Sequence, residues 1–165
     1  AGMVASVFHI LSHAATKSLL FIAAIGLTDV SGGSRRISDL TGAAYRNKWA
    51  GVAFTAGSLS MVGVPLFSGF ISKLLFAQAA VQVEGKMLAS LIVLGISTVL
   101  NAIYFMRTVI RIYATTEETS YTGITFRDMK AYAVTLVFFI LLNVILGVSS
   151  QPVVNMIEQG LAMFA

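Results

Sequence analysis

Four ionisable side chains lie inside long apolar stretches of this sequence. His9, His13 and Lys17 lie in residues 3–27, and Lys73 lies in a second apolar stretch. The first three are spaced four residues apart, so they share one face of a helix. An ionisable group within a membrane costs about 2.5–3.5 kcal/mol even on lenient insertion scales, and it marks a functional site by default. Because histidine titrates near neutral pH and can relay a proton, the pattern predicts a proton relay.

The composition indicates a membrane protein. Hydrophobic residues make up 57% of the 165 residues and charged residues only 11%, whereas soluble domains are roughly a quarter charged. The basic residues behind the net charge of +4 are scattered near the ends of apolar stretches, as membrane orientation signals are, and do not form a nucleic-acid surface. We expect one all-α polytopic membrane domain over residues 1–165.

Membrane crossings are predicted from the length of the apolar stretches, since a spanning helix needs about 20 residues. Stretches 3–27, 87–114 and 130–148 are long enough. A further apolar region, 49–83, is interrupted at 63–69 by Gly63, Pro65 and Gly69, which disrupt a helix. Residues 151–164 have helical spacing and predict a short interfacial helix.

The distribution of basic residues decides between one broken crossing and two short ones at 49–83. If the helix breaks within one crossing, loops 28–48 and 114–130 lie on one side, and only Lys86 lies on the other. The first side then holds Arg35, Arg36, Arg46, Lys48, Arg107, Arg111, Arg127 and Lys130. Two short crossings would divide the basic residues almost evenly. The positive-inside rule favours four crossings, the second broken at Pro65, with both loops cytoplasmic.

The apolar stretches contain no acidic residue that could pair with the lysines. Lys17 and Lys73 must therefore be neutral, hydrated or paired with a carboxylate from elsewhere. In the third crossing, Asn101 and Tyr104 lie one turn apart. Bridging between helices is the first interpretation for this pair, and a relay contact is the second.

Two other classes of function are open at this point. The chain could be an inert membrane scaffold whose lysines are satisfied by neighbouring subunits. It could also be a metal- or haem-binding bundle, since His9 and His13 could offer two imidazoles to a metal. No third histidine, cysteine or membrane carboxylate completes such a site, so we expect no metal and no cofactor. The sequence also contains no phosphate-binding loop or nucleophile elbow.

Two long motifs resemble a known family. Residues 8–21, FHILSHAATKSLLF, resemble the helix F-H-x-x-x-H-A-x-x-K-x-x-L-F of the antiporter-like subunits. Residues 58–73, SLSMVGVPLFSGFISK, are similar to the broken helix of that family, S-L-x-G-x-P-x-x-x-G-F-x-S-K. Shorter likenesses occur at 38–42 and 101–107. These subunits occur in respiratory complex I, in Mrp-type sodium/proton antiporters and in energy-converting hydrogenases.

The resemblance implies two inverted repeats, each forming a half-channel, joined by a central axis of lysines and histidines. In this chain His9, His13 and Lys17 would form the central connection, and Lys73 would hand protons to the far side. The first repeat, with its glutamate–lysine pair, is missing, so the resemblance implies a C-terminal fragment. The chain has one proline in the break where the family often has two, and Arg46 to Trp49 stand where a proline often precedes the broken helix.

The expected function is translocation of protons, or of a cation and protons, with no covalent chemistry in this chain itself. The expected partners are the missing N-terminal half, other membrane subunits and the lipid bilayer, with H⁺ or Na⁺ as the moving ion and no nucleic acid. The expected location is a bacterial or archaeal cytoplasmic membrane. Quinone-linked, hydrogenase and antiporter complexes all remain open.

Overall fold

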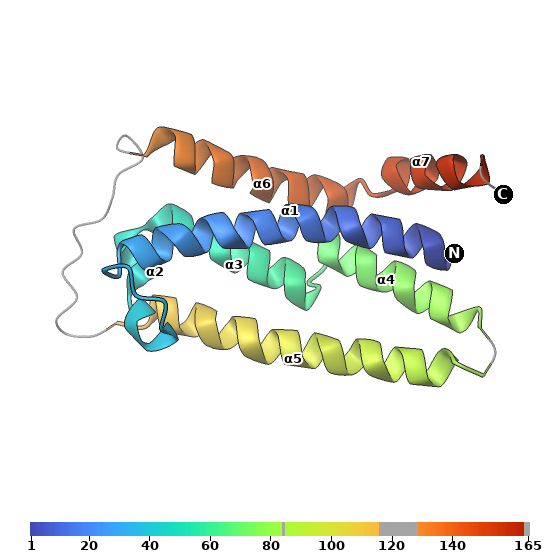
Figure 1. The fold of residues 1–165 in the computed structure, drawn as a ribbon, viewed down its shortest axis with the longest axis horizontal. Helices are drawn as coiled ribbons and strands as arrows, with labels where there is room; N and C mark the ends of the chain where they lie inside the picture. The colour runs from blue at the N-terminus through green and yellow to red at the C-terminus, as the bar shows by residue number, and fades with distance from the viewer. Residues whose placement is uncertain (84, 116–128, 164–165) are drawn as a thin grey trace.

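The structure is a computed structural model that describes residues 1–83, 85–115 and 129–163, and in these ranges it contains helices and no strand (Figure 1). The expected loop 114–130 lies mostly outside the described residues. The elements, in chain order, are α1 (Gly2–Asp29), η1 (Ile37–Leu40), α2 (Ala43–Arg46), α3 (Lys48–Val62), α4 (Ser68–Val81), α5 (Met87–Tyr113), α6 (Lys130–Val148) and α7 (Gln151–Ala162).

Among the described residues, three helices are long and apolar enough to cross a membrane. They are α1 with 28 residues, α5 with 27 and α6 with 19. At 1.5 Å per residue these lengths correspond to about 42, 40 and 28 Å, against a hydrocarbon core of about 30 Å. Helix α4 is also apolar but has only 14 residues.

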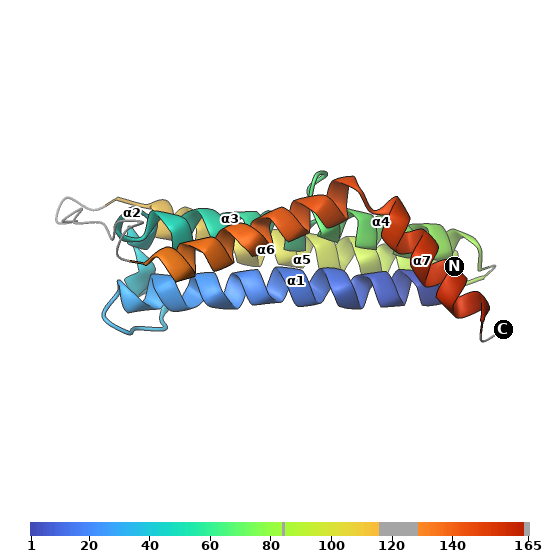
Figure 2. The ribbon, with the colours of Figure 1, turned by 90° about the horizontal axis from the view of Figure 1, so that it is seen from above.

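Helices α3 and α4 follow one another in the same direction along the bundle (Figures 1 and 2). Helix α3 ends because Gly63 adopts a left-handed conformation with φ +89°, which allows its N–H to bond back to Leu59 and Ser60. Pro65 follows two residues later, and Phe67 is extended before α4 begins. With 15 and 14 residues, α3 and α4 are each shorter than the roughly 20 residues of a typical spanning helix.

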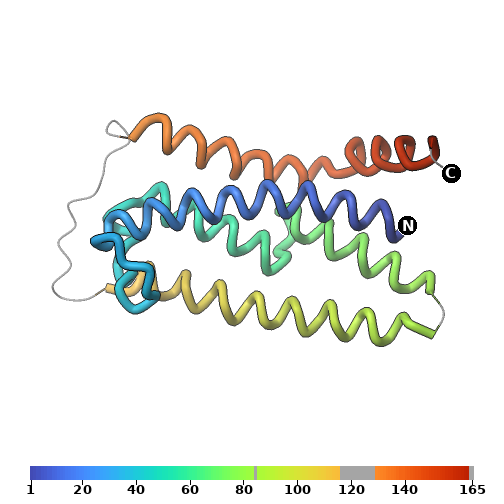
Figure 3. Tube along the Cα trace, viewed as in Figure 1, coloured from blue at the N-terminus to red at the C-terminus, as the bar shows by residue number. Residues whose placement is uncertain are grey.

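The two ends of the bundle carry different segments. The connection between α1 and α3, the end of α5 and the start of α6 lie together at one end (Figure 3). The N-terminus of α1, the turn between α4 and α5, and α7 lie at the other end. Arg46 orders the α1–α3 connection, because its guanidinium donates to the carbonyls of Val30 and Thr41 and to Ser31 Oγ.

Helix α1 lies at the centre of the packing. A cluster of buried apolar side chains joins α1 and α3 to α5, α6 and the α1–α3 connection, and includes Leu19, Leu27, Ile112 and Leu136. A smaller cluster, Val4, Phe8 and Val154, packs α7 against the start of α1. No part of the most apolar window of α5 is buried. Helix α5 therefore presents a long apolar surface to lipid or to another protein segment.

Candidate functional site

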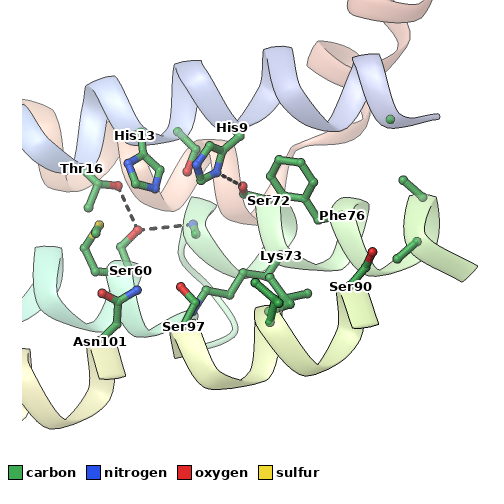
Figure 4. A pocket seen from close by; sticks show the side chains of 18 of the residues that line it. His9, His13, Thr16, Ser60, Ser72, Lys73, Phe76, Ser90, Ser97 and Asn101 are labelled. Atoms are coloured by element: carbon green, nitrogen blue, oxygen red, sulfur yellow. Dashed lines mark hydrogen bonds between the residues drawn. The ribbon is translucent and has the colours of Figure 1, made fainter. Parts of the chain in front are cut away.

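A cavity of about 890 Å³ lies between α1, α4 and α5 and reaches the end of α3 (Figure 4). Four of its lining residues are the predicted relay residues, His9, His13, Lys17 and Lys73. Both imidazoles point from α1 towards the broken region. The fold thus places three ionisable side chains of one helix at the same cavity as a lysine 56 or more positions away in the sequence.

The two histidines are in direct contact. Residues four positions apart are separated by about 6 Å along a helix axis, a gap that one ordered water could bridge. The ring centroids are only 3.9 Å apart, so no bridging water is needed between the two imidazoles. His9 Nδ1 lies 2.6 Å from Ser72 Oγ on α4, and its ring meets the edge of Phe76 at 5.1 Å. Either atom of the His9–Ser72 pair can donate, depending on the imidazole tautomer. The pair connects α1 directly to the helix that carries Lys73.

Lys73 is half-buried, and its Nζ donates a 2.6 Å hydrogen bond to the carbonyl of Val62, the last residue of α3. The carbonyl end of a helix carries a partial negative charge of about half an elementary charge, which favours a cation. Gly63 allows the lysine to come this close, since a Cβ there would lie 2.9 Å from Lys73 Cδ. From the sequence, a carboxylate or water was expected as the partner of Lys73, whereas in the structure its partner is the backbone carbonyl at the end of α3.

The remaining predicted residues have different surroundings. Lys17 lines the cavity, and its side chain is exposed. Asn101 lines the cavity from α5, whereas Tyr104 is 60% exposed and does not line it. Pro65 is exposed at the surface of the bundle.

Asn101, which the sequence predicted, is part of a longer polar stripe along α5 that was not predicted. Lys86 just before α5, Ser90 and Ser97 line the cavity with Asn101, opposite α1. Their spacing of four, seven and four residues places them on one face of a helix, and that spacing was the available signal.

A second missed feature is a buried polar cluster beside the break, made of Ser12, Thr16, Ser60, Ser68 and Asn143. Asn143 on α6 is fully buried, and its Oδ1 accepts hydrogen bonds from Thr16 at 2.7 Å, Ser68 at 2.9 Å and Ser60 at 3.1 Å. Ser12 donates to Ser68 at 2.9 Å. The signal in the sequence was an amide within the apolar stretch of α6, but only the fold identifies its partners.

Close packing at the break depends on glycine. A Cβ on Gly69 would overlap the carbonyl of Ser60, and a Cβ on Gly147 of α6 would overlap the carbonyl of Leu66. Across the three described stretches of chain, no group of three or more His, Cys, Asp or Glu side chains comes together to hold a metal ion. The polar groups that line the cavity with the histidines include serine and threonine hydroxyls and lysine amines.

Comparison with known proteins identifies the family. The family model for the transmembrane part of NADH:quinone oxidoreductase and Mrp antiporters matches residues 1–101, more than half of the chain. The chain belongs to this NADH:quinone oxidoreductase/Mrp antiporter family. The matched segment runs from α1 through the break to Asn101 and includes all four predicted relay residues.

Individual relatives come from both branches of the family. The chain is 34% identical over 108 residues to NADH-quinone oxidoreductase subunit N of Desulforudis audaxviator, covering 66% of this chain and 21% of the relative. It is 38% identical over 96 residues to Na(+)/H(+) antiporter subunit A1 of Staphylococcus epidermidis, covering 58% of this chain and 12% of the relative. The chain thus spans about a fifth or less of the length of these relatives.

A solved structure has the same fold. The Mrp complex from Dietzia sp. DQ12-45-1b matches 94% of this chain and 36% of the compared chain, with a TM-score of 0.76 and 23% sequence identity. At that identity the match concerns the fold. Together with the family and the apolar helices, it makes this an integral membrane protein of bacterial type built from helices.

Proposed function

We propose that this chain translocates protons, or a cation together with protons, through a relay formed by His9, His13, Lys17 and Lys73. The observation that carries the proposal is that these four side chains line one cavity, although Lys73 lies on a different helix from the others. Ionisable groups inside membrane proteins mark ion pathways because they are costly to keep there without a function.

The helix break gives Lys73 a partner that suits a relay. Val62 offers the lysine a neutral carbonyl, which stabilises the protonated amine without the strong attraction of a carboxylate. A lysine held in this way can release its proton more readily than one paired with an acid. Broken helices serve transport proteins for this reason, since freed carbonyls form polar sites at membrane depth.

The proposed membrane arrangement has four crossings: α1, the α3–α4 pair, α5 and α6. In this arrangement α3 and α4 cross together, and the break at 63–69 lies within the membrane. The α1–α3 connection and the α5–α6 connection face the cytoplasm, because basic residues gather at that end. Helix α7 lies near the opposite interface, where it packs on Val4 and Phe8.

We further propose that the chain works inside a multisubunit complex, as a redox-driven pump or an antiporter. The relatives support this, since one is named as a quinone oxidoreductase subunit and others as subunits of Na(+)/H(+) and probable K(+)/H(+) antiporters. Helix α5 supports it too, because its apolar surface and the polar stripe beside it offer an area for further membrane segments to cover.

The test is ion translocation by the full-length protein, in its complex, reconstituted in vesicles. Lys73→Ala and Lys17→Ala should abolish proton movement while the complex still assembles. Lys48→Ala is the matched control, because Lys48 is an exposed lysine at the start of α3. Wild-type translocation by Lys73→Ala would overturn the relay. Loss of assembly in Lys73→Ala and Lys17→Ala would instead support the inert scaffold.

A further inference from the structure

The amide of Asn143 connects helices that are otherwise joined mainly by apolar contacts. It belongs to α6, and the three hydroxyls that donate to its Oδ1 belong to α1, α3 and α4. Its amide nitrogen donates to the carbonyl of Phe139, one turn back in its own helix, and this bond fixes the orientation of the amide group. One fully buried oxygen is therefore the meeting point of four helices.

Two of these donors flank the break. Ser60 is in the last turn of α3, and Ser68 is the first residue of α4. In addition, the backbone N–H of Gly69 donates to Ser60 Oγ at 3.3 Å. The segment between α3 and α4 does not continue the helical hydrogen bonding, since Gly63 and Val64 both bond back to Leu59 and Phe67 bonds to Val64. The side-chain bonds across the gap therefore add a connection between α3 and α4 that the backbone does not provide.

This connection controls the surroundings of Lys73. Lys73 lies one turn after Gly69 on α4, and its acceptor Val62 lies two residues after Ser60 on α3. The 2.6 Å bond between them spans the break, so its length depends on how the two half-helices are held relative to each other.

The cluster is not suited to carrying protons itself. A hydroxyl both donates and accepts, but a neutral amide oxygen only accepts. Ser12 connects through Ser68 to Asn143 Oδ1, and Thr16 and Ser60, which also bond to each other at 3.0 Å, both donate to the same oxygen. A proton that passed between the Ser68 branch and the Thr16–Ser60 branch through this oxygen would have to protonate an amide, so the cluster serves to hold the helices.

We propose that Asn143 is a positioning residue that fixes α3 and α4 across the break and thereby holds Lys73 against Val62. The role assigned to Lys73 rests on the proposed function, but the fixing of the break does not. Removing the amide oxygen would take one hydrogen-bond acceptor from each of three buried hydroxyls. The free-energy cost of these lost hydrogen bonds favours separation of α3 and α4 and entry of water.

The test measures the exposure of the break directly. In the full-length protein in its complex, in native membranes and without other accessible cysteines, Lys73→Cys would report on the site and Ala53→Cys on the packed core of α3, where Ala53 is fully buried. Labelling rates with a water-soluble maleimide would be compared with Asn143 intact, with Asn143→Leu and with Ser68→Ala. Thr135→Ala is the matched control on α6, since the Thr135 hydroxyl donates to the carbonyl of Ala131 in its own helix.

With Asn143→Leu we expect labelling at position 73 to rise about tenfold, the factor that corresponds to about 1.4 kcal/mol, and labelling at position 53 to stay unchanged. Ser68→Ala should give a smaller rise at position 73, and Thr135→Ala none. Unchanged labelling at position 73 would overturn the proposal, as would an equal rise at both positions, which would indicate general loosening.

If Asn143→Leu does not assemble, Ser68→Ala and Ser60→Ala decide by the same criteria. Because labelling needs no transport, the result stands even if Lys73→Ala pumps normally.

Discussion

The ε-amino group of Lys73 bonds to the carbonyl of Val62, the residue at which α3 ends. This bond ties a titratable side chain to the interruption of a helix. An uninterrupted α3 would use the Val62 carbonyl within the helix, and no acceptor would be left for the lysine. The break and the lysine are therefore parts of one structural unit.

Lys73→Arg should lose ion translocation as fully as Lys73→Ala. Arginine keeps the positive charge and can still donate to Val62, but its pKa is too high for it to release a proton. We expect the translocation rate to fall by about 100-fold, the lower bound for losing a positioned proton donor or acceptor. Proton uptake by vesicles measures the rate, with Lys48→Arg as the control. A working Lys73→Arg protein would show that charge alone is needed at this position.

Ser72→Ala should slow translocation without affecting assembly. Ser72 Oγ is the partner of His9 Nδ1 at 2.6 Å and holds the imidazole in place, whichever of the two atoms donates. We expect a loss of about tenfold, and Ser72→Thr, which keeps the hydroxyl, should recover most of the rate. The control is Ser6→Ala, because Ser6 is exposed and bonds to the carbonyl of Gly2 in its own helix. Equal rates for Ser72→Ala and Ser6→Ala would remove the His9–Ser72 pair from the relay.

Gly69→Ala should destabilise the protein, because the added methyl group would overlap the carbonyl of Ser60. Overpacking of this kind costs about 1–3 kcal/mol. Gly95→Ala is the matched control in α5, where a Cβ meets nothing within 4 Å. That substitution should be neutral or stabilise the helix by up to about 1 kcal/mol. Thermal unfolding of the purified complex in detergent would measure both, and equal effects would contradict the close contact at the break.

The membrane arrangement can be tested by cysteine labelling from each side. Cysteines at Ser34 and Thr115 should react from the cytoplasmic side and a cysteine at Gln82 from the opposite side, because α3 and α4 cross together in the proposed arrangement. If Ser34 and Gln82 react from the same side, α3 and α4 are separate crossings. In that case the break lies in a surface turn and Lys73 loses its place in the relay.

Helical structure could be predicted from the sequence because local chemistry decides it. Gly63 and Pro65 end a helix through their own backbone preferences, and long apolar stretches form helices wherever a membrane excludes water from the backbone. The shared face of His9, His13 and Lys17 follows from helical spacing alone. The family motifs at 8–21 and 58–73 added the expectation that Lys73 belongs with these residues, which spacing could not provide.

The contacts between side chains from distant parts of the chain could not be predicted from the sequence. Lys73 was expected to need an acid or water, because a backbone carbonyl becomes available only where the helix stops in three dimensions. Asn143 was not identified from the sequence, because its three donors lie 75 to 127 positions away. The contact of the two imidazoles also depended on rotamers that spacing leaves open.

The hydrogen bonds around Asn143 have a consequence for how the protein responds to membrane voltage. A potential of 100 mV acts on each elementary charge with about 2.3 kcal/mol, and it exerts no net force on neutral groups. The side chains of Ser12, Thr16, Ser60, Ser68 and Asn143 are all uncharged. An electric field across the bilayer would therefore exert a force on a protonated Lys73. It would exert no net force on these uncharged side chains, which fix the helices around the lysine.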